Sequence, residues 1–148
     1  MQAKDTLSVF VVDDDAFCRA LYAQHLRNQG YINVKTFHDG QDCLNHLTEQ
    51  PDIIFLDYNM EPLNGLEVLK KIKRFNPDIY LVIVSGQEDM QVAINALKYG
   101  AFDYVIKGDA ELEMIDKVLV KIDKVMDALR QRQPGKLRSL LTNLRTRG

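Results

Sequence analysis

Hydrophobic positions fall in short apolar runs that are separated by longer segments with helical periodicity. The runs cover residues 9–12, 33–37, 53–56, 80–84 and 103–106. Their length and their content of Val, Ile and Phe are typical of buried parallel strands. The run at 33–37 is more polar than the others, so we expect it at an edge of the sheet.

The intervening segments predict five helices. These cover residues 16–28, 41–49, 65–75, 90–99 and about 110–131. Asp39 is a suitable N-cap for the second helix, while Gly30 and Gly100 end the first and fourth. This alternation predicts an α/β fold with a doubly wound, five-stranded parallel sheet and right-handed crossovers. The flavodoxin-like strand order 2-1-3-4-5 suits these units.

Composition supports a single globular domain. Of the 148 residues, 46% are hydrophobic and 27% are charged, which is ordinary for a soluble protein with one core. No apolar run is long enough for a membrane span, and the N-terminus lacks the features of a signal peptide. We therefore expect a cytoplasmic protein in which Cys18 and Cys43 are reduced thiols.

The C-terminal segment differs from the rest of the chain in charge. Six basic and no acidic residues follow residue 129, whereas residues 1–129 hold 13 basic and 21 acidic residues, a net charge of −8. Leucines spaced i, i+3, i+4 and i+7 predict an amphipathic helix in this tail: Leu137, Leu140, Leu141 and Leu144. Such a helix could dock on the protein itself, bind a partner or a second copy, or bind nucleic acid or an anionic membrane. The apolar stripe of the last long helix is longer than the part that the core would bury. This favours a homodimer that forms through that helix and the tail.

Acidic side chains end two of the predicted strands. Asp13, Asp14 and Asp15 follow the first run, and Asp57 ends the third. In the predicted order these strands flank the point where strand order reverses, which is where α/β sheets bind ligands. Acids at this position could simply cap the first helix. However, crowded carboxylates repel one another unless a divalent cation or protonation relieves them, so we favour a Mg²⁺ site.

Two further residues reach the same edge. Ser85 ends the fourth predicted strand and Lys107 ends the fifth. A carboxylate, a hydroxyl, an ammonium group and a cation suit phosphoryl transfer to an aspartate, with Asp57 as the nucleophile. The cation and Lys107 would neutralise phosphoryl oxygens, and Ser85 would donate a hydrogen bond to another.

Taken together, these motifs resemble the receiver domain of two-component response regulators, in particular the single-domain, chemotaxis-regulator type. The resemblance covers residues 7 to about 130 and rests on the order and spacing of four motifs: residues 11–15, Asp57-Tyr58-Asn59-Met60 with Gly65, Val84-Ser85-Gly86, and Tyr104-Val105-Ile106-Lys107. It divides the chain into a receiver domain at 1–131 and a basic helical tail at 132–148.

The resemblance implies roles for individual residues. Asp57 matches the phosphate-accepting aspartate, and Lys107 would pair with its carboxylate or phosphoryl group. Mg²⁺ would be bound by the carboxylates of Asp14 and Asp57 and by the backbone carbonyl of Asn59, while Asp13 would hold a metal-bound water. Ser85 and Tyr104 match the switch positions, and Asn59 and Gln87 match the variable positions that tune phosphoryl hydrolysis.

The resemblance also implies partners. A sensor histidine kinase or a phosphotransfer protein would donate the phosphoryl group, and an unknown downstream protein would read the phosphorylated state. We expect no enzymatic or DNA-binding output domain after residue 133.

Two positions depart from the family pattern, because Glu61 and Gly108 stand where proline is usual. A trans bond before Gly108 is favoured, since a cis bond there costs about 2.5–4 kcal/mol.

Two alternatives remain at this point. One is a pseudo-receiver that binds partners without phosphorylation, which Glu61 and Gly108 make plausible. The other is a Mg²⁺-dependent phosphatase that acts through an aspartyl phosphate. The phosphatase is disfavoured because Asn59 stands where such an enzyme needs a second acid, and because the chain has no substrate-capping domain.

Overall fold

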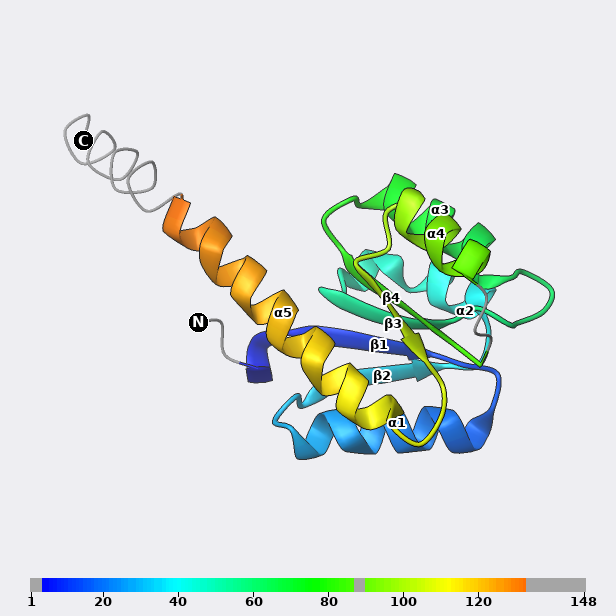
Figure 1. The fold of residues 1–148 in the computed structure, drawn as a ribbon, viewed down its shortest axis with the longest axis horizontal. Coiled ribbons are helices and arrows are strands. Elements are labelled where there is room, and N and C mark those ends of the chain that lie inside the picture. The colour runs from blue at the N-terminus through cyan, green and yellow to red at the C-terminus, as the bar shows by residue number, and fades with distance from the viewer. Residues whose placement is uncertain (1–3, 87–89, 133–148) are drawn as a thin grey trace.

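A parallel sheet forms the centre of the protein in the computed structural model, which describes residues 4–86 and 90–132 (Figure 1). The strands are paired in the order β2-β1-β3-β4-β5, which confirms the predicted topology. Their bounds are β1 Ser8–Val12, β2 Asn33–Phe37, β3 Ile53–Asp57, β4 Tyr80–Ser85 and β5 Asp103–Ile106. The polar strand β2 lies at an edge, as its sequence predicts.

Each strand is followed by a helix, with bounds close to those predicted. They are α1 Ala16–Asn28, α2 Gly40–Asn45, α3 Gly65–Phe75, α4 Met90–Lys98 and α5 Glu111–Arg132, and a 3-10 turn, η1 Lys4–Thr6, precedes β1. The carboxylate of Asp39 caps α2 as expected. The prediction at 41–49 was wrong in one respect, because a separate 3-10 helix, η2 Leu47–Glu49, follows α2. Gln50 then takes a left-handed conformation (φ 59°) directly before Pro51, where α-helical geometry is disfavoured.

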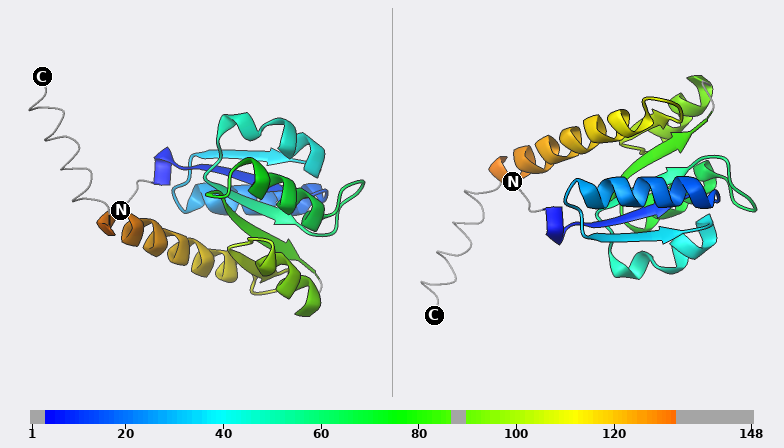
Figure 2. Two further views of the ribbon diagram at one scale, coloured as in Figure 1. Left: turned by 90° about the horizontal axis from the view of Figure 1, so that it is seen from above. Right: turned by 90° about the horizontal axis from the view of Figure 1, so that it is seen from below.

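Helices cover both faces of the sheet, so successive residues of the central strands enter two different cores (Figure 2). On one face, α1 and α5 pack on residues such as Val9, Val11 and Phe55. On the other face, α2, α3 and α4 pack on residues such as Phe10, Ile54 and Leu56. Burial on both faces explains why the strand sequences are continuously apolar.

Helix α5 is longer than the sheet requires. Its last fully buried side chain is Ile122, and the helix continues to Arg132 with Leu129 47% exposed. Figure 1 shows this end projecting beyond the sheet.

Gln87 and the predicted tail helix lie outside the described residues. Within the part of the chain that the structure describes, no helix has the length and apolar character needed to cross a membrane.

Candidate functional site

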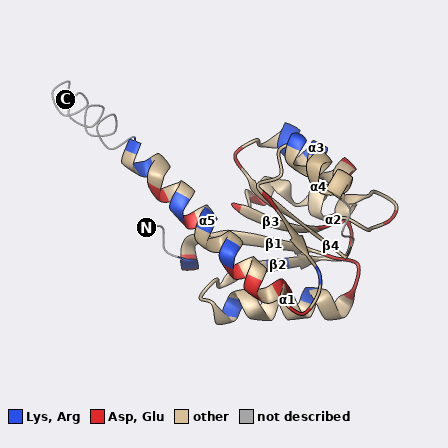
Figure 3. Cartoon of the chain, viewed as in Figure 1, with Lys and Arg blue, Asp and Glu red and all other residues tan. Residues whose placement is uncertain are grey.

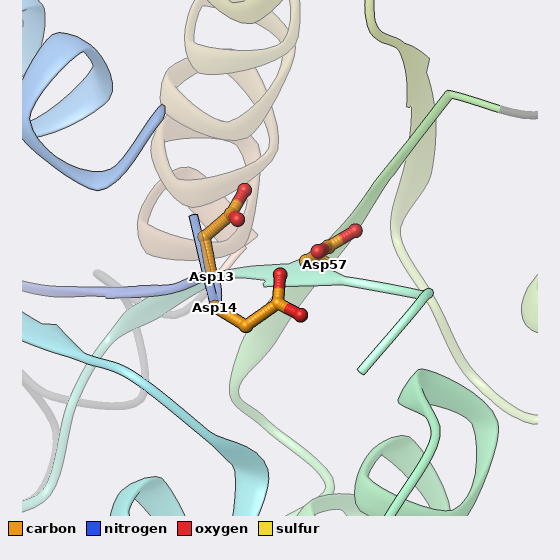
Figure 4. Close-up of side chains that lie close together, drawn as sticks. All are labelled: Asp13, Asp14 and Asp57. Atoms are coloured by element: carbon orange, nitrogen blue, oxygen red, sulfur yellow. The ribbon is translucent and has the colours of Figure 1, made fainter. Parts of the chain in front are cut away.

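Three carboxylates converge at the ends of β1 and β3. The register pairs Val12 with Leu56, so the residues that follow this pair, Asp13 and Asp57, are neighbours in space. Each of Asp13, Asp14 and Asp57 offers an oxygen within 4.8 Å of the others (Figure 4). Asp13 and Asp57 are buried, whereas Asp14 is exposed. Among residues 4–86 and 90–132, this is the one cluster of at least three acidic, His or Cys side chains close enough to share an ion.

Local hydrogen bonds fix how the three consecutive acids divide their roles. Asp13 Oδ1 accepts from the N–H of Asp15 at 2.9 Å, which orients the buried carboxylate. Asp15 turns away and caps α1 by accepting from the N–H groups of Phe17 and Cys18. The capping interpretation therefore holds for Asp15, while Asp13 and Asp14 join Asp57.

Arg19 contributes to the site, although the sequence patterns did not indicate it. The guanidinium of Arg19 donates to the carbonyl of Asp13 at 2.8 Å, which ties the start of α1 to the end of β1. Arg19 lies four residues after the cap Asp15, so it is one helical turn into α1 and can reach back over the turn. That spacing was the available signal.

Lys107 supplies positive charge to the cluster. Its Nζ lies 2.8 Å from Asp13 Oδ2, 3.6 Å from Asp57 Oδ1 and 3.9 Å from Cys18 Sγ. The backbone places it there, since the N–H of Lys107 donates to the carbonyl of Ser85 at 2.8 Å. Burial acts to lower the pKa of Lys107, but the hydrogen bond to Asp13 and the charge of Asp57 outweigh it and raise this pKa. Lys107 is therefore a permanent cation at this site.

One positive charge does not balance three acids. Burial, together with repulsion from Asp13, raises the pKa of Asp57 to about 7, against the opposing effects of Lys107 and of the Asn59 N–H at 3.3 Å. A carboxylate that is so disfavoured as an anion is stabilised by a nearby divalent cation. Hard carboxylate oxygens are the ligands that Mg²⁺ prefers, so the donor set fits this ion.

The remaining predicted site residues differ in how deeply they are buried. Ser85 is fully buried at the end of β4, and Tyr104 of β5 is half-buried against the core beneath α4. Asn59 and Glu61 are exposed in the loop after β3. The Glu61–Pro62 bond is the single cis peptide of the described residues, so the bond before Gly108 is trans as expected.

Gly65 allows the loop after β3 to close tightly. Its N–H donates to the carbonyl of Tyr58 at 2.8 Å. A Cβ atom at this position would lie 2.6 Å from Tyr58 Cα and 2.9 Å from the carbonyl oxygen of Asp57. Both of these are backbone atoms, so a side chain at residue 65 would displace the segment that carries Asp57.

Comparison with known proteins agrees with this geometry. The family model of the response regulator receiver domain matches residues 9–119, so the chain belongs to this family. It is 32% identical to the DNA-binding transcriptional regulator NtrC of Proteus hauseri over 93% of this chain and 28% of the relative. It is 39% identical to the transcriptional regulatory protein ZraR of Escherichia coli K12 over 70% of this chain and 23% of the relative. The chain thus spans a small part of the length of these relatives.

Solved structures share the fold. The response regulator domain of Thermotoga maritima CheB has a TM-score of 0.71 at 30% identity, covering 82% of this chain and 96% of its own. A response regulator receiver domain protein from Clostridium thermocellum has a TM-score of 0.75 at 25% identity. The match covers 83% of this chain and 98% of that structure. These likenesses confirm the receiver domain that the sequence motifs predicted.

Proposed function

We propose that the chain is a phosphorylated signalling protein in which Asp57 accepts the phosphoryl group. A phosphohistidine of a sensor histidine kinase or a phosphotransfer protein would be the donor, in the cytoplasm. Mg²⁺ would be held by Asp13, Asp14 and Asp57 together with the carbonyl of Asn59. The observation that carries the proposal is the convergence of three carboxylates within 4.8 Å of one another beside the ammonium of Lys107.

The residues of the site suit an in-line displacement. An oxygen of Asp57 forms a bond to phosphorus as the phosphorus–nitrogen bond of the donor breaks, and the imidazole takes up a proton. When bound, Mg²⁺ lowers the repulsion between the phosphoryl oxygens and the acids. Lys107 would contact a second phosphoryl oxygen as a fixed charge, and the hydroxyl of Ser85, at the end of β4, would donate to a third.

Phosphorylation would act on partners through a conformational equilibrium. Engagement of Ser85 by the phosphoryl group would favour an inward position of Tyr104, which is half-buried in this structure. These residues lie beside α4, which carries exposed apolar side chains: Met90 76%, Ile94 50% and Leu97 50%. An apolar helix surface of this kind supports a protein–protein contact as the output.

The proposal is tested by intact-mass measurement after incubation with acetyl phosphate and Mg²⁺. The parent chain should gain the mass of one phosphoryl group, and Asp57→Asn should gain none. Asp109→Asn is the matched control, because Asp109 is an exposed acid outside the cluster and its replacement should leave labelling intact. A parent chain that stays unlabelled while it still folds and binds a partner would support the pseudo-receiver instead.

A further inference from the structure

Exposed basic side chains gather where α3 and α4 end. We call this group the basic end: Lys70, Lys71 and Arg74 of α3 and Lys98 of α4. Because all strands are parallel, the helices return to the edge where the strands begin, opposite the acidic site. Figure 3 shows the basic residues at this end of α3. The chain as a whole has a net charge of −2, so this is a positive region on an acidic protein.

Stabilisation of the helices accounts for only part of the basic end. Basic residues in the last turn interact favourably with the helix dipole, which explains Arg74 and Lys98. Lys70 and Lys71 lie before the last turn of α3. No carboxylate of the described residues forms an ion pair with any of the four, whereas several other bases have such partners: Lys35, Lys107, Lys121 and Arg130. Among the described residues, none of the four basic side chains is therefore in contact with a carboxylate.

Apolar groups are interspersed among these charges. The Nζ of Lys70 lies 4.2 Å from the centre of the Tyr99 ring, and that of Lys98 lies 5.7 Å from it. Tyr99 is 41% exposed, and Phe75, which follows Arg74, is 53% exposed. A hollow of ≈ 530 Å³ beside this region is lined in part by Lys73, Gly100 and the exposed Leu129. The region combines bases with exposed aromatic and aliphatic side chains.

We propose that the basic end binds the surface of a membrane that contains anionic lipid. Anionic headgroups attract Lys and Arg, and aromatic rings such as those of Phe75 and Tyr99 partition to the headgroup boundary. The association is peripheral and independent of phosphorylation at Asp57.

A nucleic acid fits the same region less well. The phosphates of a duplex would pair with the Lys and Arg side chains, but a duplex would leave Phe75 and Leu129 without apolar partners. Single-stranded bases need an open aromatic face for stacking. The ring of Tyr99 is already approached by the ammonium groups of Lys70 and Lys98. Mixed basic and apolar surfaces are typical of attachment to lipid.

Sedimentation of the full chain with lipid vesicles tests the proposal. We expect binding to phosphatidylcholine vesicles that contain phosphatidylserine, no binding to pure phosphatidylcholine, and weakening by salt. The triple variant Lys70→Gln/Lys71→Gln/Arg74→Gln should lower the partition coefficient by about tenfold or more. The matched control Lys117→Gln/Lys121→Gln/Lys124→Gln removes the same charge from exposed positions of α5 and should change it by less than about twofold.

Several results would overturn the proposal. These are absence of binding to the anionic vesicles, equal loss in the two triple variants, or no loss in the basic-end variant. A labelled DNA oligonucleotide that binds more tightly than the vesicles, with the same sensitivity to the basic-end variant, would assign the surface to nucleic acid. Thermal unfolding should show both variants folded, and Asp57→Asn should bind vesicles like the parent whether or not Asp57 is the phosphoacceptor.

Discussion

The ammonium of Lys107 lies closer to Asp13, at 2.8 Å, than to Asp57, at 3.6 Å. Asp13 is 1% exposed, so its anion gains most from this contact. Asp57, which is also buried, lies farther from the ammonium group and is repelled by the negative charge of Asp13. Burial first, and then the repulsion of Asp13, raise the pKa of Asp57 to about 7, because Lys107 at the longer distance opposes them only in part.

Removal of the Lys107 charge should destabilise the folded protein. Lys107→Met should lower the free energy of unfolding by about 2–4 kcal/mol in metal-free buffer, because a buried acid loses its partner. Lys121→Met is the control, since its ion pair with Asp103 is exposed and should contribute less than about 1 kcal/mol. Urea unfolding of the three proteins measures the difference. Equal losses in the two variants would show that Lys107 does not stabilise the acidic cluster.

The pH dependence of stability follows from the raised pKa of Asp57. Its pKa is about 7 in the folded protein and about 3.9 when unfolded, so the folded state holds a proton that the unfolded state releases between these values. The contribution of Asp57 to the free energy of unfolding is therefore full at low pH and is lost as pH rises through about 7. Asp57→Asn cannot lose this contribution, so the stability of this variant relative to the parent should increase by about 2–3 kcal/mol between pH 5 and pH 8. Urea unfolding without metal at both pH values checks this; a difference that stays constant with pH would contradict the assignment.

Protons and Mg²⁺ should compete for the site. Because Asp57 must be ionised to bind the cation, the Mg²⁺ affinity should fall by up to about tenfold for each pH unit below its pKa of about 7. Calorimetric titration at pH 8 and pH 6 gives the ratio. An affinity that is unchanged over this range would mean that Asp57 is not a ligand.

Gly65 should be required for the shape of the phosphorylation loop. Gly65→Ala places a methyl group against the backbone of Tyr58 and Asp57, so we expect a loss of about 2 kcal/mol or more and slower labelling by acetyl phosphate. Gly108→Ala is the matched control, because no atom lies within 4 Å of a Cβ at that position. Thermal unfolding and labelling rates should therefore differ between the two variants. Similar behaviour would argue that the loop adjusts freely.

The order of the strands could be predicted from the sequence because strand length, helical period and the alternation of the two can each be recognised in short stretches of the chain. The residue pattern also placed Asp13, Asp14, Asp57, Ser85 and Lys107 at one edge, since the carboxyl ends of parallel strands meet there. The residue pattern alone did not show that Asp15 caps α1 while Asp13 and Asp14 face Asp57, because this depends on the direction of the backbone after Val12. Nor could it find the contact of Arg19 with the Asp13 carbonyl or the preference of Lys107 for Asp13, which depend on side-chain directions across elements.

We infer that Asp13, Asp14 and Asp57 form a divalent cation site. The most direct measurement is a titration of the isotope-labelled chain with Mg²⁺, followed by amide chemical shifts. The largest shifts should centre on residues 13–15 and 57–59, near millimolar Mg²⁺, and Asp57→Asn should weaken them. Shifts centred elsewhere, or none at saturating Mg²⁺, would contradict the claim.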